Sequence, residues 1–313
     1  MVPPPKLHLL LFFLGHPSFV AVAAANQCFA DDDELQTAVD QYIDQNCTTA
    51  NTCDVGQIYG TPMNSWCVAN VTDMTKLFSG KSSFNEEISA WDVSSVTKME
   101  KTFYSALAFN GNLNAWVVSN VINTEKMFSD AEAFNTDISN WNVSNVITSE
   151  GMFAGASAFN QDLSSWFVSK VTNMASMFSG AEAFNSDLGG WDVSAVEDME
   201  KMFQKAAFFN SDLSAWDTSN VTNMGGTFSD AIVFNSTLSL WDVSRVTSLK
   251  GMFDNARAFD SDLESWDVSQ VTNFAGMFVD ASSFKGEGLG GWKVSSALTM
   301  ERMFAEGELL YEK

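Results

Sequence analysis

Apolar residues recur along this chain with a fixed period. After Trp66 a tryptophan follows every 25 residues as far as Trp266, and Trp292 follows after 26. The copy that begins at Trp191 reads WDVSAVEDMEKMFQKAAFFNSDLSA, and the copies share the pattern W-D-V-S-x-V-T-x-M-x-x-M-F-x-x-A-x-x-F-N-x-D-L-S-x. A period of this length predicts a solenoid, in which each repeat buries its apolar face against its neighbours.

Two spacings of apolar residues divide each repeat. Around Trp166, the residues Leu163, Val168 and Val171 follow the spacing of a leucine-rich repeat, whose central residues form a short strand with alternate side chains inward. From Val171 the apolar residues then recur at intervals of three and four, which predicts one face of a short helix. This helical face comprises Val171, Met174, Met177, Phe178 and Ala181.

Acidic residues at one position support the predicted helices. Thr97 and Glu100 have the spacing of an N-terminal capping box, and glutamates recur at that place in the first turn, where the helix dipole favours anions. These glutamates are Glu125, Glu150, Glu200 and Glu301. We therefore expect an α/β repeat fold: a leucine-rich-repeat-like, right-handed solenoid with one short strand and one short helix per 25-residue repeat.

Four segments are expected along the chain. Residues 1–25 are typical of a signal peptide, with a charge at Lys6, an apolar run over residues 7–14 and a small-residue end. A membrane anchor is the competing interpretation, but the apolar run is well short of the roughly 20 residues that span a bilayer. Residues 26–65 form a cysteine-containing N-terminal cap, 66–304 form about ten repeats, and 305–313 form a C-terminal tail. The cap should hold a helix near residues 33–46, whose apolar face is Leu35, Val39, Tyr42 and Ile43.

The cysteines and the sequons indicate secretion. All of the cysteines, Cys28, Cys47, Cys53 and Cys67, follow the predicted leader, so two disulfides in one of three pairings are expected in an oxidising compartment. A metal site is the alternative, although no C-x-x-C motif is present. Glycosylation sequons begin at Asn46, Asn70, Asn142, Asn220 and Asn235.

One register of asparagines should satisfy backbone groups in the turns through an internal ladder of hydrogen bonds. It consists of Asn85, Asn110, Asn135, Asn160, Asn185, Asn210 and Asn235. We therefore expect the Asn235 sequon to be unused, whereas Asn142 follows an inward tryptophan and should point outward. Glycosylation is then expected at Asn46, Asn70, Asn142 and Asn220.

Charge and histidine content exclude several classes of function. The chain has 16 basic and 39 acidic side chains and a net charge of -23, which argues against binding nucleic acid or anionic membranes. Its two histidines, His8 and His16, lie in the predicted leader, so Ser-His-Asp catalysis and histidine-ligated zinc are not expected. A paired-carboxylate hydrolase needs two acids in unlike environments, whereas these acids occupy repeated positions. We therefore expect no enzymatic activity and no tightly bound cofactor.

The repeated M-F-x-x-A-x-x-F-N-x-D-L-S-x-W-D-V-S-x-V-T-x-M run, from Trp66 to Phe304, resembles the BspA-like leucine-rich-repeat surface proteins. The resemblance implies a leucine-rich-repeat-like solenoid on a secreted or surface protein of bacteria or microbial eukaryotes. For some bacterial members it also implies adhesion to host or extracellular proteins.

The best candidate for a binding face is the row of residues that directly follow each tryptophan, because Trp and the next Val should face inward. This predicted face comprises Val117, Asn142, Phe167, Asp192, Asp217, Asp242 and Asp267. Its four aspartates would lie about 4.8 Å apart in stacked parallel strands. They form either a solvated acidic face or a ladder that recruits calcium or a basic partner. A second row near the turn, able to cap backbone amides, comprises Asp137, Asp162, Asp187, Asp212 and Asp262.

These observations predict a secreted or cell-surface-associated, non-enzymatic recognition or adhesion solenoid that binds an extracellular protein or glycan. The alternative is a passive structural component of a wall or extracellular matrix. A threonine row at Thr72, Thr97, Thr172, Thr222, Thr247 and Thr272 suggests ice or mineral binding, but it is interrupted, and helix capping would explain it. An uncovered last repeat also predicts end-to-end self-association.

Overall fold

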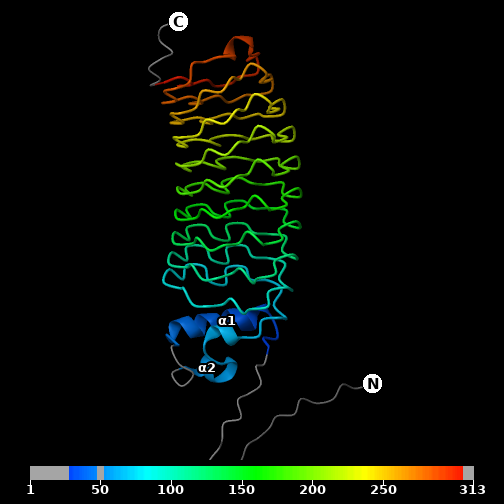
Figure 1. Cartoon of the computed structure of the whole chain (residues 1–313), viewed down its shortest axis with the longest axis vertical. Coiled ribbons are helices and arrows are strands. Elements are labelled where there is room, and N and C mark those ends of the chain that lie inside the picture. Colours follow the sequence, from blue (N-terminus) through cyan, green and yellow to red (C-terminus); the bar gives the residue numbers. More distant parts are fainter. Residues whose placement is uncertain (1–27, 48–52, 306–313) are drawn as a thin grey trace, which may run out of the picture.

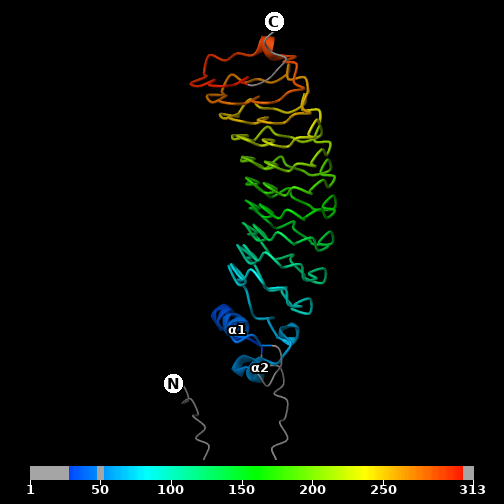
Figure 2. The same cartoon turned by 90° about the vertical axis from the view of Figure 1, so that its left-hand side faces the viewer.

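The computed structural model describes residues 28–47 and 53–305. The 25-residue repeats stack as successive coils of an elongated column, and two helices close its N-terminal end (Figures 1 and 2). The predicted signal peptide lies outside the described residues, as do residues 306–313 of the predicted tail. Among the described residues, no helix has both the length and the apolar character needed to cross a bilayer.

The helices are α1 (Asp32–Asp44), α2 (Asp54–Tyr59) and two single-turn 3-10 helices, η1 (Met63–Ser65) and η2 (Leu289–Gly291). The helix predicted near residues 33–46 is confirmed as α1, whose buried face includes Leu35, Val39 and Tyr42. The side chain of Asp31 caps α1 by accepting the backbone N–H of Glu34 at 2.9 Å. Three acidic residues follow in the first turn, where their negative charges interact favourably with the helix dipole.

Two disulfides join the cap. Cys28 bonds to Cys67 at the start of the first coil, and Cys47 bonds to Cys53 between α1 and α2. The indole of Trp66, the first of the repeated tryptophans, packs against Phe29, Tyr42 and Tyr59 of the cap on one side and stacks on Trp91 on the other. The cap therefore continues the aromatic core of the coils.

The expected α/β repeat is wrong. The described coils contain no helix apart from η2, and they contain no strand. Neighbouring coils share one isolated parallel bridge each, as between Thr148 and Asn173. The predicted strand around Trp166 is instead a pair of turns, closed by hydrogen bonds from Trp166 N–H to the Leu163 carbonyl at 3.0 Å and from Val171 N–H to the Val168 carbonyl at 2.9 Å. The fold is a solenoid of stacked turns.

Left-handed residues explain why no helix forms. The tenth residue after each tryptophan has positive φ, and so does the fourteenth wherever it is described, for example 55° at Lys101 and 52° at Ser105. A right-handed helix cannot run through such residues. Every second amide in this stretch donates to a carbonyl of the next coil, as the amide of Phe103 does to Met127. Each amide that lies between two of these donates to a carbonyl three residues earlier and so closes a turn within its own coil. Inward-facing residues therefore recur at intervals of three and four residues although no helix forms.

The core is built from three columns of stacked aromatic rings. Phe128 lies between Phe103 and Phe153, with centroids 5.4 and 5.7 Å apart, and the second phenylalanine of each repeat forms a parallel column. The tryptophans form the third column, as in the pair of Trp166 and Trp191 at 6.5 Å. Each indole from Trp116 onward also donates to a carbonyl of an earlier coil, as Trp191 Nε1 does to Leu163 at 3.0 Å. The tryptophans therefore serve the core.

Candidate functional site

The residues that directly follow each tryptophan form one exposed row, called here the post-tryptophan row. Trp166 and Val168 are buried on either side of Phe167, which has 73% of its surface exposed, and Val117 is 54% exposed. The inward–outward alternation of these three positions is therefore present although no strand forms. Asn142 and the aspartates Asp192, Asp217, Asp242 and Asp267 are exposed in the same row.

Two shallow hollows lie along the apolar part of the row. One, of about 320 Å³, is lined by Trp116, Val117 and Asn142. The other, of about 420 Å³, is lined by Trp141, Asn142 and Phe167. Asn142 therefore lines both hollows, and each hollow also has one exposed apolar side chain of the row in its lining.

Local hydrogen bonds account for the aspartates of the row. The Oδ1 atom of Asp217 accepts the backbone N–H of Ser219 at 3.0 Å, and Asp267 accepts that of Ser269 at 3.1 Å. Asn142 makes the same turn with Ser144 at 3.1 Å. Bonds from Ser219, from its side chain first and then its backbone, lower the pKa of Asp217, and Ser269 lowers the pKa of Asp267 in the same way. Each carboxylate therefore has a structural role.

The second acidic row makes the same kind of turn, as the sequence predicted. Asp137 accepts the N–H of Ser139, and Asp162 that of Ser164, each at 2.9 Å. Among the described residues, no group of three or more His, Cys, Asp or Glu side chains is placed to hold a metal ion. Most carboxylates of both rows thus cap their own turns, at a spacing set by the repeat.

The sequons differ in how their side chains are held. The amide nitrogens of Asn70 and Asn220 donate to the backbone carbonyls of Phe29 at 3.0 Å and Ser194 at 2.7 Å. Asn46 and Asn142 are exposed. The Asn235 side chain lies in the asparagine ladder, where its Oδ1 accepts the N–H of Asp260 at 2.9 Å.

The asparagine ladder joins successive coils, but along the surface. Asn110 N–H donates to Asn85 Oδ1, and Asn135 N–H to Asn110 Oδ1, each at 2.9 Å with exposed side chains. The threonine row has a comparable role, because Thr247 Oγ1 donates to the Thr222 carbonyl of the preceding coil at 3.2 Å. Helix capping is therefore not the reason for these threonines.

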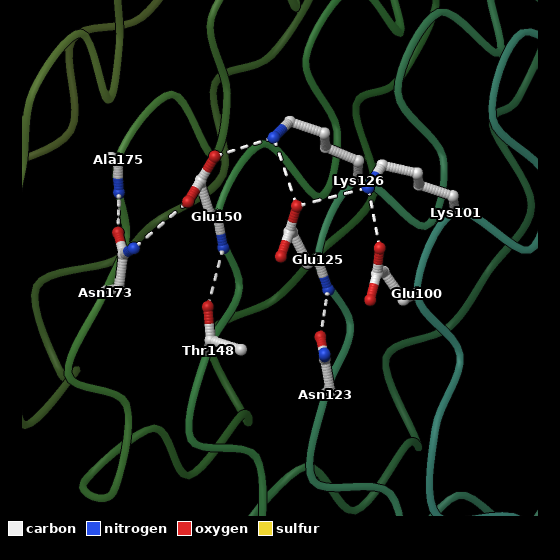
Figure 3. Close-up of polar contacts among 9 residues, drawn as sticks. All are labelled: Glu100, Lys101, Asn123, Glu125, Lys126, Thr148, Glu150, Asn173 and Ala175. Carbon is white, nitrogen blue, oxygen red and sulfur yellow. Dashed lines mark hydrogen bonds and ion pairs between the residues drawn. The ribbon is translucent and has the colours of Figure 1, made fainter. Parts of the chain in front are cut away.

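Two of the glutamates assigned to helix starts, Glu125 and Glu150, belong with Glu100 to a chain of charges (Figure 3). Lys126 Nζ lies 3.1 Å from Glu125 Oε1 and 2.7 Å from Glu150 Oε1, and Lys101 links Glu100 to Glu125. Burial alone would raise the pKa of Glu125, but the bonds and charges of Lys126 and Lys101 outweigh it and lower that pKa. The expected capping box of Thr97 and Glu100 is absent, because no helix begins there.

A groove in the last five coils is a feature that the sequence analysis missed. It has a volume of about 790 Å³ and is lined in part by Gly226, Gly251 and Gly276. A glycine signal was available, because glycine recurs at the tenth residue after tryptophan, inside the segment predicted as helix. Glycine costs about 1 kcal/mol in a helix interior.

The stacked coils define a tandem-repeat solenoid, and the post-tryptophan row is exposed along it. The two disulfides are consistent with an extracellular protein. The chain belongs to the family described as "Mycoplasma protein of unknown function, DUF285", which matches residues 45–166, 137–239 and 208–312. Three tandem matches fit a repeat surface protein. No curated protein matches the chain.

Proposed function

We propose that this chain is a secreted, non-enzymatic recognition or adhesion protein that binds an extracellular protein or glycan through the post-tryptophan row. The observation that carries the proposal is Phe167, a phenylalanine 73% exposed at a position where half of the repeats have aspartate. Exposed aromatic side chains beside concave, partly polar surfaces are typical of interface centres. The resemblance to BspA-like surface proteins supports the same proposal.

The repeat itself supplies the test. Aspartate occupies this position in Asp192 and Asp217, so the double variant Val117→Asp plus Phe167→Asp should keep the fold while removing the apolar surface. Leu240→Ser is the matched control, because Leu240 is 76% exposed at a position where Ser165 and Ser265 stand in other copies. It also lies outside both hollows.

The three proteins are immobilised and exposed to extracellular matrix extract, and captured material is identified by mass spectrometry and then measured by surface plasmon resonance. Wild type and Leu240→Ser should capture the same partner. The affinity of the double variant for that partner should be lower by a factor of at least about ten. Equal capture by all three proteins would show that the post-tryptophan row is not the binding face. Capture of nothing by wild type would favour the passive structural component.

We also propose end-to-end self-association, because Leu298 in the last described coil is 86% exposed and Met300 lies beside it in the sequence at 41%. Light scattering across a concentration series should show a rising mass for wild type and a smaller rise for Leu298→Thr, which restores the residue found at this position in Thr272. A constant monomer mass at high concentration would reject the association.

A further inference from the structure

The groove runs along the face formed by residues six to thirteen positions after tryptophan, from the coil of Trp191 to the coil of Trp292. Its floor includes Gly226, Gly251 and Gly276, each the tenth residue after a tryptophan. Lys201 and Arg302 occupy the equivalent position in the first and last of these coils, so the groove is bounded at both ends by a long side chain.

The groove exists because three consecutive coils lack a side chain at this position. In earlier coils Lys101 and Lys126 hold the same place, and their ion pairs with Glu100, Glu125 and Glu150 cover this face of the solenoid (Figure 3). The same face is therefore covered by charged side chains in the coils of Lys101 and Lys126 and is open in the groove. Between the two, Gly151 and Ser176 occupy this position.

Backbone geometry does not require these glycines. The φ angle is 59° at Gly251 and 64° at Gly276, while Lys101 and Ser176 adopt 55° and 56° at the equivalent position. A Cβ atom at Gly251 would meet its nearest neighbour at 3.9 Å, and one at Gly276 at 3.5 Å, which are ordinary contacts. A Cβ atom at Gly226 would be closer, at 3.2 Å from the flexible side chain of Lys201. A longer residue at Gly251 or Gly276 would fit the fold, and it would fill the groove.

The walls present hydroxyl and amide groups. One wall includes Thr222, Thr247 and Ser248. The hydroxyls of Thr222 and Thr247 donate inward to backbone carbonyls at 3.1 and 3.2 Å. A hydroxyl that donates inward keeps its lone pairs to accept from a ligand. Gln204 and Ser229 also line the groove, at the thirteenth position after tryptophan, where the lining segment of each coil ends.

Charge in the groove is balanced, in contrast to the net charge of -23 on the whole chain. The lining has three cations, Lys201, Lys250 and Arg302, and three anions, Glu200, Asp254 and Glu301. An anionic polymer would be repelled by the surrounding surface, and an apolar ligand would find few apolar side chains in the lining. The lining therefore suits an uncharged ligand rich in hydroxyl groups.

We propose that this groove binds a linear, uncharged oligosaccharide whose long axis lies along the solenoid. Equivalent residues of neighbouring coils, such as Thr222 and Thr247, lie about 4.8 Å apart, which is close to the length of one sugar unit in an extended chain. Four coil steps span about 19 Å. This site uses residues that are all different from those of the proposed recognition face, and it is independent of that proposal.

The probes are soluble linear glucan, chitin, mannan and xylan oligosaccharides, each from disaccharide to octasaccharide. They are screened on an array and then measured by calorimetry with the full secreted chain. Gly251→Gln plus Gly276→Gln fills the floor, and Ser176→Gln is its control at the same coil position outside the groove. Thr247→Val removes one wall hydroxyl, and Thr97→Val removes the equivalent hydroxyl, which makes the same inter-coil bond at 3.2 Å, outside the groove.

One oligosaccharide series should bind, with affinity rising with length and then levelling once the groove is filled. The double glutamine variant should lose at least about tenfold in affinity and Thr247→Val about threefold, while both controls bind as wild type. Absence of binding in every series would overturn the proposal. It would also be overturned by unchanged binding in both groove variants, or by an extended peptide competing for the groove where no sugar does. Val117→Asp plus Phe167→Asp should leave this binding unchanged, which separates the two sites.

Discussion

The carboxylate of Asp32 in α1 accepts the backbone N–H of Thr72 in the first coil at 2.7 Å. In the next coil the equivalent amide, that of Thr97, donates instead to the carbonyl of Thr72 at 2.8 Å. Asp32 also accepts the amide of Asp73 at 3.1 Å. One side chain of the cap thus replaces the coil that would otherwise precede the first repeat, and it protects an edge that solenoids must cover.

Asp32→Ala should therefore loosen the first coil. The loss of these bonds should lower the free energy of unfolding by about 1–2 kcal/mol and speed hydrogen exchange at the Thr72 and Asp73 amides. Asp33→Ala, one residue along the same helix, is the control. It should leave the exchange of both amides unchanged and remove only the contribution of Asp33 to the helix-dipole interaction. Unchanged exchange at Thr72 in the Asp32 variant would contradict the role given to this cap.

The aspartates of the post-tryptophan row should be replaceable by asparagine but not by alanine. Asn142 already makes the turn that Asp217 makes, so Asp217→Asn should keep the stability at neutral pH in protein made without glycosylation, while Asp217→Ala loses about 1 kcal/mol. Urea denaturation measures both variants.

Acid should destabilise the fold through the same bonds. Serine hydrogen bonds hold the pKa values of Asp92, Asp217 and Asp267 in the folded chain below the unfolded value of about 3.9. The resulting stability is present above that value and is lost as the pH falls through the folded pKa values. The midpoint temperature of thermal unfolding should therefore decrease as the pH is lowered below about 4. The decrease should be smaller in a variant in which all three aspartates are asparagine. An equal fall in that variant would refute the assignment.

Trp191→Phe should remove both buried surface and the bond from Nε1 to the Leu163 carbonyl. We expect a loss of about 2–4 kcal/mol, because a cavity and an unpaired carbonyl remain in the core. Trp292→Phe is the comparison, since Trp292 makes the equivalent bond but is only partly buried, and it should cost less. Equal losses in calorimetry would argue against the indole column as the main support.

Removing the Cys28–Cys67 disulfide should cost more than removing Cys47–Cys53. The first bond closes a loop with a sequence separation of 39 and the second one of 6, which the chain-entropy relation converts to about 4 and about 2 kcal/mol. Paired serine variants and denaturant titration test the order. A larger loss for Cys47→Ser plus Cys53→Ser would reverse it.

Glycans on secreted protein should be found at Asn142 in preference to Asn70 and Asn220. The amide nitrogens of Asn70 and Asn220 donate to backbone carbonyls, and a glycan on either nitrogen would weaken that bond. Peptide mapping with and without glycosidase measures occupancy at each site. High occupancy at Asn220 and none at Asn142 would contradict the expectation.

The sequence by itself determined the 25-residue unit, the tryptophan core and the exposure of Phe167. In each W-D-V segment the first and third side chains are apolar and face inward, so the second faces outward even though no strand forms. It also placed the helix of the cap and the turns of the second acidic row. The tertiary structure decided the backbone of the repeat. A spacing of three and four arises from a helix or from turns with left-handed residues such as Lys101, and only the inter-coil hydrogen bonds choose between them. The groove was likewise hidden, because it needs three glycines in successive coils to lie side by side.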